Sequence, residues 1–167
     1  MLDHIGLRVQ DFGKALEFYR SALSTIGYEV VMEFPDAAGL GEKGKPDFWL
    51  MKGEPSANPA HVAFVSDRAS VDAFHIAAIA AGGTDNGAPG LRLDYHPHYY
   101  AAFVRDPEGN NIEVVCHTPP GQKRMAARSP AKASKKKTPA RKAAKAKAKP
   151  KAAAGKQRGK KAKKKKK

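Results

Sequence analysis

The sequence predicts an α+β domain over residues 1–120, built from two βαβββ modules, followed by a basic tail over residues 121–167. Three observations predict this organisation. A strand-then-helix pattern occurs twice, extended runs broken by Gly and Pro follow each copy, and the composition changes abruptly near Gly121. Elements in this order form a mixed sheet whose helices cover one face, here expected to be cupped. We place the modules at about residues 1–54 and 58–118.

The repeat is visible residue by residue. Residues 3–11 and 60–67 both alternate in polarity, start near a His and end at an Asp. Each run leads into a helical pattern, over residues 15–27 in the first copy and 71–83 in the second. A shift of 56 residues places Phe18 on Phe74 and Gly27 on Gly83. Two copies of one unit are therefore predicted.

Further strands are expected at 28–34 and 47–52 in the first module, and at 91–95, 99–106 and 110–117 in the second. The segment 106–110, Asp-Pro-Glu-Gly-Asn, is a turn sequence, because Pro presets φ and Gly supplies a positive φ. This turn predicts that the chain's last two strands form an antiparallel hairpin.

Charge divides the chain in the same place. Of its 31 Lys and Arg residues, nine lie in 1–121 together with all 16 Asp and Glu, and 22 lie in 122–167. The first part is thus mildly acidic, at −7, and the tail is a polycation. Cys116, the single cysteine, excludes an intramolecular disulfide and favours a reducing compartment. No apolar stretch approaches the roughly 18 residues of a membrane span, so we expect a cytoplasmic protein.

Strand alternation predicts a candidate metal triad. His4, His61 and Glu113 fall on the faces that point away from the helices, opposite the apolar residues of their strands. Two imidazoles and one carboxylate can hold a divalent ion and leave positions open for substrate or water. The alternative is two hydrogen-bonded His at strand starts and a solvated carboxylate. The repeat favours the triad, because it would bring equivalent His residues near a pseudo-twofold axis.

The segment 95–100, Tyr-His-Pro-His-Tyr-Tyr, is a candidate pocket wall. His96, Tyr99 and Tyr100 would contact a small apolar substrate. The alternative is a rigid surface loop with its aromatic rings packed beneath it.

Two residues of the first module are further substrate-binding candidates. Arg8 could bind an anionic substrate group, or it could pair with Asp3 or Asp11. Trp49 could serve as a substrate platform or belong to the core.

An early strand reading H-I-G-L-R-V-x-D, a second His-led strand in mid-chain and a terminal D-P-E-G-N-N-I-E together resemble the vicinal oxygen chelate (glyoxalase/bleomycin-resistance/dioxygenase) superfamily over residues 2–118. The resemblance implies paired modules with His4, His61 and Glu113 as ligands of a divalent metal (Mn, Fe, Co, Ni or Zn). It implies a catalytic role for Glu113 and a homodimer in which each site mixes residues of both chains.

The activity within this superfamily is less determined. Lactoylglutathione lyases carry a further Glu ligand in the first module's last strand, where residues 47–51 read Asp-Phe-Trp-Leu-Met, with Trp49 near the missing carboxylate. Glu33 could substitute for that carboxylate or be a solvated strand-edge residue. Fosfomycin-modifying thiol transferases carry Thr where this chain has Gly6, and extradiol dioxygenases usually have more modules. We expect a glyoxalase-like metal-dependent enzyme acting by lyase, dioxygenase or thiol-transferase chemistry on a small oxygen-chelating substrate. The alternative is a metal-free binding or resistance-type domain.

The tail contains Lys, Ala, Arg, Pro and Ser/Thr almost exclusively and has no aromatic residue, so we expect it to be disordered. Its composition resembles the Lys/Ala/Pro-rich tails of linker histones, which implies contact with nucleic-acid phosphates and association with the nucleoid. RNA, polyphosphate or an acidic membrane are alternative partners. The candidate contact residues are Lys135, Lys136, Lys137, Arg141, Lys142, Lys163, Lys164 and Lys165.

Overall fold

The computed structural model describes residues 2–121, so the candidate nucleic-acid contacts of the tail lie outside the described residues. The first module contains β1 (Ile5–Val9), α1 (Phe12–Ser24), β2 (Glu29–Phe34), β3 (Ala37–Glu42) and β4 (Lys45–Lys52). The second contains β5 (His61–Val65), α2 (Arg68–Ala80), β6 (Thr84–Leu91), β7 (Tyr100–Arg105) and β8 (Asn111–Cys116). This order confirms the two βαβββ modules.

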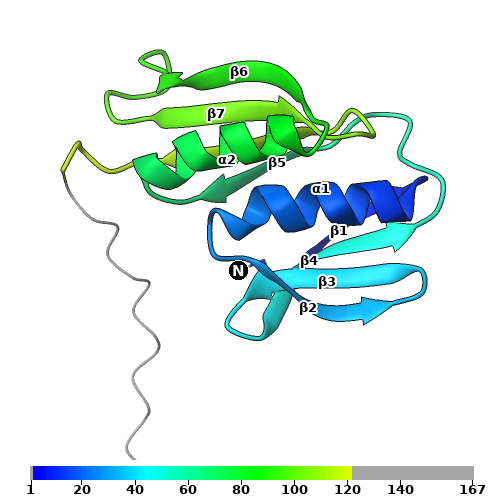
Figure 1. Ribbon diagram of the computed structural model, residues 1–167. Helices are drawn as coiled ribbons and strands as arrows, with labels where there is room; N and C mark the ends of the chain where they lie inside the picture. Colours follow the sequence, from blue (N-terminus) through cyan, green and yellow to red (C-terminus); the bar gives the residue numbers. More distant parts are fainter. Residues whose placement is uncertain (1, 122–167) are drawn as a thin grey trace, which may run out of the picture. The chain divides into compact units, whose positions relative to one another are not determined.

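Each module forms its own four-stranded mixed sheet. The strand orders are β1-β4-β3-β2 and β5-β8-β7-β6, so the first and last strands of each module are neighbours. These neighbours run parallel, and the remaining pairs are antiparallel. The helices α1 and α2 lie side by side, each across one face of its own sheet (Figure 1). The α+β class is confirmed, and each sheet keeps one face free of helices.

Both helices begin three residues earlier than the apolar periodicity predicts, because an Asp caps each of them. The amide of Lys14 donates to Asp11 Oδ1 at 3.0 Å, and the amide of Ser70 donates to Asp67 Oδ1 at 2.9 Å. These side chains satisfy amides that the first helical turn leaves without an intrahelical acceptor. Within residues 2–121, no helix combines the length and the apolar character that a membrane crossing requires.

Two strand predictions need correction. β3 was not predicted from the sequence, because Ala-Ala-Gly-Leu-Gly-Glu contains no β-branched residue. The strand is held by its pairing with β2 and β4. The strand expected at 91–95 is wrong, since β6 ends at Leu91 and a loop follows. In this loop the amide of Arg92 donates to the Tyr99 carbonyl at 2.8 Å, and the amide of Tyr95 donates to the Arg92 carbonyl at 3.0 Å.

A chain of aromatic rings joins the two modules in the core. Tyr19 of α1 contacts Phe18 and Phe48, with ring centroids 5.0 and 4.9 Å apart, and Phe48 contacts Phe64 of the second module at 5.4 Å. All four side chains are buried. Their burial removes a large apolar area from water, which makes this cluster a main source of the domain's stability.

The predicted turn between β7 and β8 is confirmed and also connects the modules. Gly109 has a φ of +89°, and the amide of Asn110 donates to Asp106 Oδ1 at 2.8 Å. The hydroxyl of Tyr19 donates to Asp106 Oδ2 at 2.6 Å in a buried environment. Glu108 accepts the amides of residues 10 and 11, at the start of α1, at 2.9 and 3.1 Å. Much of the terminal motif therefore has a structural role.

Candidate active site

A pocket of about 680 Å³ opens on the helix-free face of the second sheet. Its side chains come from β5, β7, β8 and the loop between β6 and β7, because alternate residues of these strands point to this face. The residues that line it are His61, Asp94, Tyr95, His96, Tyr99, Phe103, Asn111 and Glu113. Of the predicted site residues, the structure brings His61, His96, Tyr99 and Glu113 together here.

His61 and Glu113 meet at the floor of this pocket. His61 Nε2 lies 3.2 Å from Glu113 Oε2, and the Glu113 carboxylate is only 2% exposed. The hydroxyl of Tyr99 donates to the other oxygen, Oε1, at 2.6 Å. Burial, and then the Glu113 carboxylate, raise the pKa of Tyr99 above its usual value, so its hydroxyl keeps its proton and remains a donor. This leaves Oε2 as the oxygen that faces the imidazole.

Asn111 fixes the orientation of the His61 ring. Its side-chain Nδ2 lies 2.8 Å from His61 Nδ1, and its carbonyl oxygen lies 3.1 Å from the same nitrogen. One neighbour is a donor and the other an acceptor, so Nδ1 finds a partner in either neutral tautomer. The side-chain oxygen of Asn111, Oδ1, accepts a hydrogen bond from Asn86 Nδ2 at 3.0 Å. Both arrangements turn Nε2 toward Glu113, as a second residue commonly does for a metal-binding His.

The loop between β6 and β7 forms one wall of the pocket through His96 and Tyr99. His96 Nε2 lies 2.8 Å from Nδ1 of His117, just beyond β8, and the amide of His98 donates to His96 Nδ1 at 3.1 Å. The Tyr99 ring contacts the rings of His96 and His117 edge-on, with centroids 5.3 and 5.1 Å apart. These contacts attach the loop to the end of β8.

Tyr100 does not belong to this pocket, contrary to the prediction. It follows Tyr99 directly and therefore points to the opposite face of the strand, where it packs against the core. Its hydroxyl donates to Asp72 of α2 at 2.7 Å, and the Arg68 guanidinium lies 4.8 Å from the centre of its ring.

His4 does not join His61 and Glu113 within one chain. It precedes β1, is exposed, and lies 2.9 Å from Asp3. It lines a different hollow, of about 170 Å³, together with Phe48, Val62 and other residues. Among residues 2–121, no group of three His, Cys, Asp or Glu side chains is placed to hold a metal ion. The complete triad predicted from the sequence is therefore not assembled by a single copy of the chain.

Arg8 and Trp49 lie on the helix-free face of the first sheet, away from this pocket. Trp49 is the register partner of Gly6, and its indole approaches Gly39 closely enough that a Cβ there would sit 3.0 Å from it. Arg8 is exposed beside Gly53. Neither Asp3 nor Asp11 pairs with it among the described residues, since Asp3 binds His4 and Lys45 and Asp11 caps α1.

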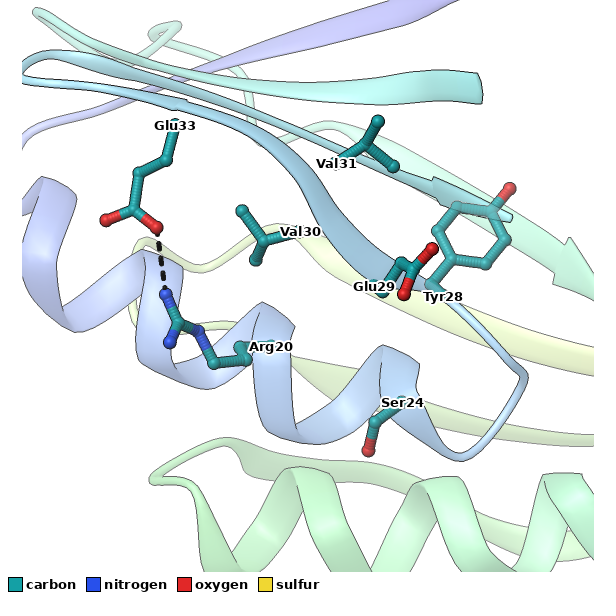
Figure 2. A pocket seen from close by; sticks show the side chains of 7 residues that line it. All are labelled: Arg20, Ser24, Tyr28, Glu29, Val30, Val31 and Glu33. Atoms are coloured by element: carbon teal, nitrogen blue, oxygen red, sulfur yellow. Dashed lines mark hydrogen bonds and ion pairs between the residues drawn. The ribbon is translucent and has the colours of Figure 1, made fainter. Parts of the chain in front are cut away.

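Glu33 is not positioned as a replacement metal ligand. Figure 2 shows it pointing to the side of β2 that faces α1, where it forms an ion pair of 3.1 Å with Arg20. The pair borders a separate pocket of about 500 Å³ that also contains Ser24 and Val30. Both side chains are about half exposed, so Glu33 is the solvated strand-edge carboxylate that the sequence allowed.

Four lining residues were not among the predicted site residues: Asp94, Tyr95, Phe103 and Asn111. Of these, only Tyr95 lies in the segment 95–100 that was expected to form a pocket wall. Asn111 and Phe103 could have been found from alternation, because Asn111 lies two residues before Glu113 and Phe103 is the register partner of Glu113 in β7. Asp94 belongs to the segment that was predicted as a strand, so no alternation pattern could have placed it.

Comparison with known proteins identifies the family. The sequence pattern of the Glyoxalase/Bleomycin resistance protein/Dioxygenase superfamily matches residues 1–114. The chain therefore belongs to this superfamily, as the resemblance implied. No curated protein matches the chain at a significant level.

Solved structures of similar fold agree with this assignment. A glyoxalase/bleomycin resistance protein from Albidiferax ferrireducens T118 is 26% identical, with a TM-score of 0.60, over 70% of this chain and 98% of its own. A lactoylglutathione lyase from Agrobacterium tumefaciens is 20% identical, with a TM-score of 0.54, over 70% and 92%. The fosfomycin resistance protein FosX from Mesorhizobium loti is 17% identical, with a TM-score of 0.56, over 71% and 92%. The latter two support the fold alone.

Proposed function

We propose that the chain is a glyoxalase-like, metal-dependent enzyme that acts on a small oxygen-chelating substrate in the pocket of the second module. The observation that carries this proposal is the 3.2 Å approach of His61 Nε2 to the buried Glu113 Oε2. Burial of a carboxylate is unfavourable unless a cation or hydrogen-bond donors compensate it. The Tyr99 hydroxyl donates a hydrogen bond to one carboxylate oxygen of Glu113. The other oxygen faces the His61 imidazole nitrogen at the floor of the open pocket.

These two atoms fit a divalent metal ion. An imidazole and a carboxylate suit Mn, Fe, Co, Ni or Zn rather than a purely oxygen-liganded ion. Since one chain supplies only two of the three predicted ligands, we propose that His4 of a second copy completes the site in a homodimer.

The residues of the pocket have distinct roles in this proposal. His61 and Glu113 would hold the ion, Asn111 orients His61, and Tyr99 fixes one Glu113 oxygen. A bound divalent ion supplies Lewis-acid stabilisation of substrate oxygens as negative charge develops on them. Glu113 would be a ligand first, and Oε2 would accept a substrate proton only when its bond to the ion loosens, because Tyr99 keeps its own proton and stays bound to Oε1.

Mixing two inactive variants tests both the metal site and its shared nature. His4→Ala and Glu113→Gln should each abolish metal binding. In a twofold dimer with shared sites, a mixed dimer of these variants regains one intact site of two. Random mixing should therefore restore about one quarter of the wild-type metal content per chain. The content is measured by elemental analysis after refolding the two variants together and, as a control, separately.

Two outcomes contradict this proposal in different ways. If mixing restores no metal although each variant folds, the sites are not shared between chains. If the wild-type chain holds no divalent metal and its thermal midpoint does not respond to Mn²⁺, Co²⁺, Ni²⁺ or Zn²⁺, the enzyme proposal fails. A metal-free binding domain then remains the better interpretation.

We further propose that the tail binds nucleic acid without sequence preference. All 16 acidic residues lie within 1–121, whereas residues 122–167 carry 22 basic ones, so the tail is the polycationic part of the chain. If about ten of these residues contact phosphates, the log–log salt slope of DNA affinity should be about −9. The absence of aromatic residues from the tail argues against stacking on single-stranded bases.

DNA retention separates this proposal from its alternatives. The full-length chain should be retained on duplex DNA at low salt and released at high salt, and a chain ending at residue 121 should not be retained. Retention of the shortened chain would refute a tail-borne interaction. Stronger binding to polyphosphate or acidic vesicles than to DNA of equal charge would assign the tail to a different polyanion.

A further inference from the structure

Arg92 occupies a defined position beside the pocket. It directly follows β6, and its guanidinium carbon lies 5.4 Å from the centre of the Phe103 ring. One guanidinium nitrogen, Nη2, donates to the carbonyl of Ala88 at 2.7 Å. The backbone of Arg92 is bonded to Tyr99 and Tyr95 across the loop. Both ends of the residue are therefore held, and the side chain is directed over the helix-free face of the second sheet.

Two glycines of β6 provide the room for this guanidinium. A Cβ at Gly87 would lie 3.3 Å from Arg92 Nη2 and 3.0 Å from Phe103 Cδ2, and a Cβ at Gly90 would lie 3.0 Å from Arg92 Nη1. The pairing of β6 with β7 also shifts register at both glycines. Irregularities of this kind often redirect a side chain next to a functional site.

The positive charge of Arg92 is not neutralised by an acidic side chain within the part of the chain that the structure describes. Arg20, in contrast, has its charge neutralised by an ion pair with Glu33. A guanidinium has five N–H donors in a planar fork, and one hydrogen bond to Ala88 leaves most of them unused. Such a group is suited to bind an oxyanion through two parallel hydrogen bonds.

Arg92, Phe103 and Glu113 form a row across the open face of the sheet. Phe103 is the register partner of Glu113 on one side and of Gly87 on the other. Adjacent strands are about 4.8 Å apart, so β8 and β6 are separated by about 10 Å. The row thus has an imidazole–carboxylate pair at one end and a cation at the other, with the Phe103 ring between them, stacked with His61 at 6.4 Å and lying under the Arg92 guanidinium at 5.4 Å.

We propose that Arg92 binds an anionic group of the substrate, and that the substrate class is an aromatic or apolar organic acid. Its oxyanion would lie on Arg92, its apolar portion on Phe103, and its chelating oxygens toward His61 and Glu113. This inference rests on the proposed function for the last of these three contacts only. The anion-binding end requires no metal and can be tested in its absence.

The test compares an acid with its neutral amide on the full-length chain. Affinities for 3-phenylpropanoate and 3-phenylpropanamide are measured by calorimetry with and without Mn²⁺, for wild type, Arg92→Met and Arg20→Met. Wild type and Arg20→Met should prefer the acid about tenfold or more, because hydrogen bonds between charged groups are the stronger ones. Arg92→Met should bind both compounds about equally. The basic tail is the same in all three proteins, so its own attraction for acids cancels in the comparison.

Two results would overturn this inference: no acid preference in wild type, or the same preference in folded Arg92→Met. If Arg92→Met does not fold, Gly90→Ala serves instead, because its added Cβ displaces the guanidinium and should lower the preference. Failure of the proposed function is distinguished by the Mn²⁺ arm. An acid preference that depends on Arg92 while Mn²⁺ neither binds nor changes affinity refutes the metal site and leaves the anion site intact.

Discussion

Trp49 occupies in the first sheet the position that Glu113 occupies in the second. Trp49 is the register partner of Gly6, two residues after His4, and Glu113 is the register partner of Ala63, two residues after His61. The two modules thus place a His at the same point and differ at the residue opposite. Where a second carboxylate would provide a fourth ligand, this chain has an indole. The indole at this position is consistent with the proposed metal site of three ligands. It argues against the proposal of lactoylglutathione lyase chemistry, which would need a fourth.

Tyr99→Phe should weaken divalent metal binding about 10- to 100-fold, the usual cost of removing a residue that positions a metal ligand. The variant loses the 2.6 Å hydrogen bond that fixes Glu113 Oε1. Tyr100→Phe is the matched control, since that hydroxyl binds Asp72 on the opposite face. Titration of both variants with Mn²⁺ or Co²⁺ measures the difference. Equal affinities would show that Tyr99 does not support the site.

Tyr19→Phe should destabilise the domain by about 1–3 kcal/mol, because Asp106 Oδ2 loses a buried 2.6 Å hydrogen bond that connects the modules. Asp106 keeps its bonds to Asn110, so its carboxylate is not left without partners. Urea unfolding gives the free energy of unfolding. Tyr95→Phe is the control, since Tyr95 is 66% exposed and its replacement should change stability little. A wild-type midpoint for Tyr19→Phe would contradict a stabilising bond.

The domain should lose stability above pH 10. Burial, and then the Asp106 carboxylate, raise the pKa of Tyr19 well above its usual 10.0. Its stabilising contribution is complete below pH 10, where folded and unfolded states are both protonated. Above pH 10 the unfolded state releases this proton and the folded state retains it, so unfolding becomes more favourable by up to about 1.4 kcal/mol per pH unit. Tyr19→Phe should flatten this alkaline limb, and an unchanged slope would contradict the raised pKa.

Glu33→Gln should leave metal affinity unchanged and alter stability by at most about 1 kcal/mol, the range for an exposed ion pair. Its partner is Arg20, and both side chains are about half exposed. Glu113→Gln in the same metal titration provides the contrast. A loss of metal in the Glu33 variant would show that this carboxylate reaches the site in the assembled protein.

The sequence was most informative where local chemistry and repetition coincide. The turn at 106–110 and the two His-led strands were readable because each depends on neighbouring residues. The Asp caps that start both helices three residues earlier were not predicted. β3 was not readable, since small residues and glycines give no alternating signal and its position comes from β2 and β4 on either side. Likewise, the glycines of β6 carry no indication in sequence that they make room for Arg92.

By itself the sequence determined the α+β class, the two modules and the candidate ligand types, because periodicity and repeats are properties of the chain. Only the tertiary structure decided which candidates meet. It placed Glu113 between Tyr99 and His61, turned Tyr100 to the opposite face of its strand, and kept His4 apart from Glu113 and His61. The physical reason is that strand alternation fixes the face on which a side chain lies, whereas proximity depends on strand order and on how the modules pack.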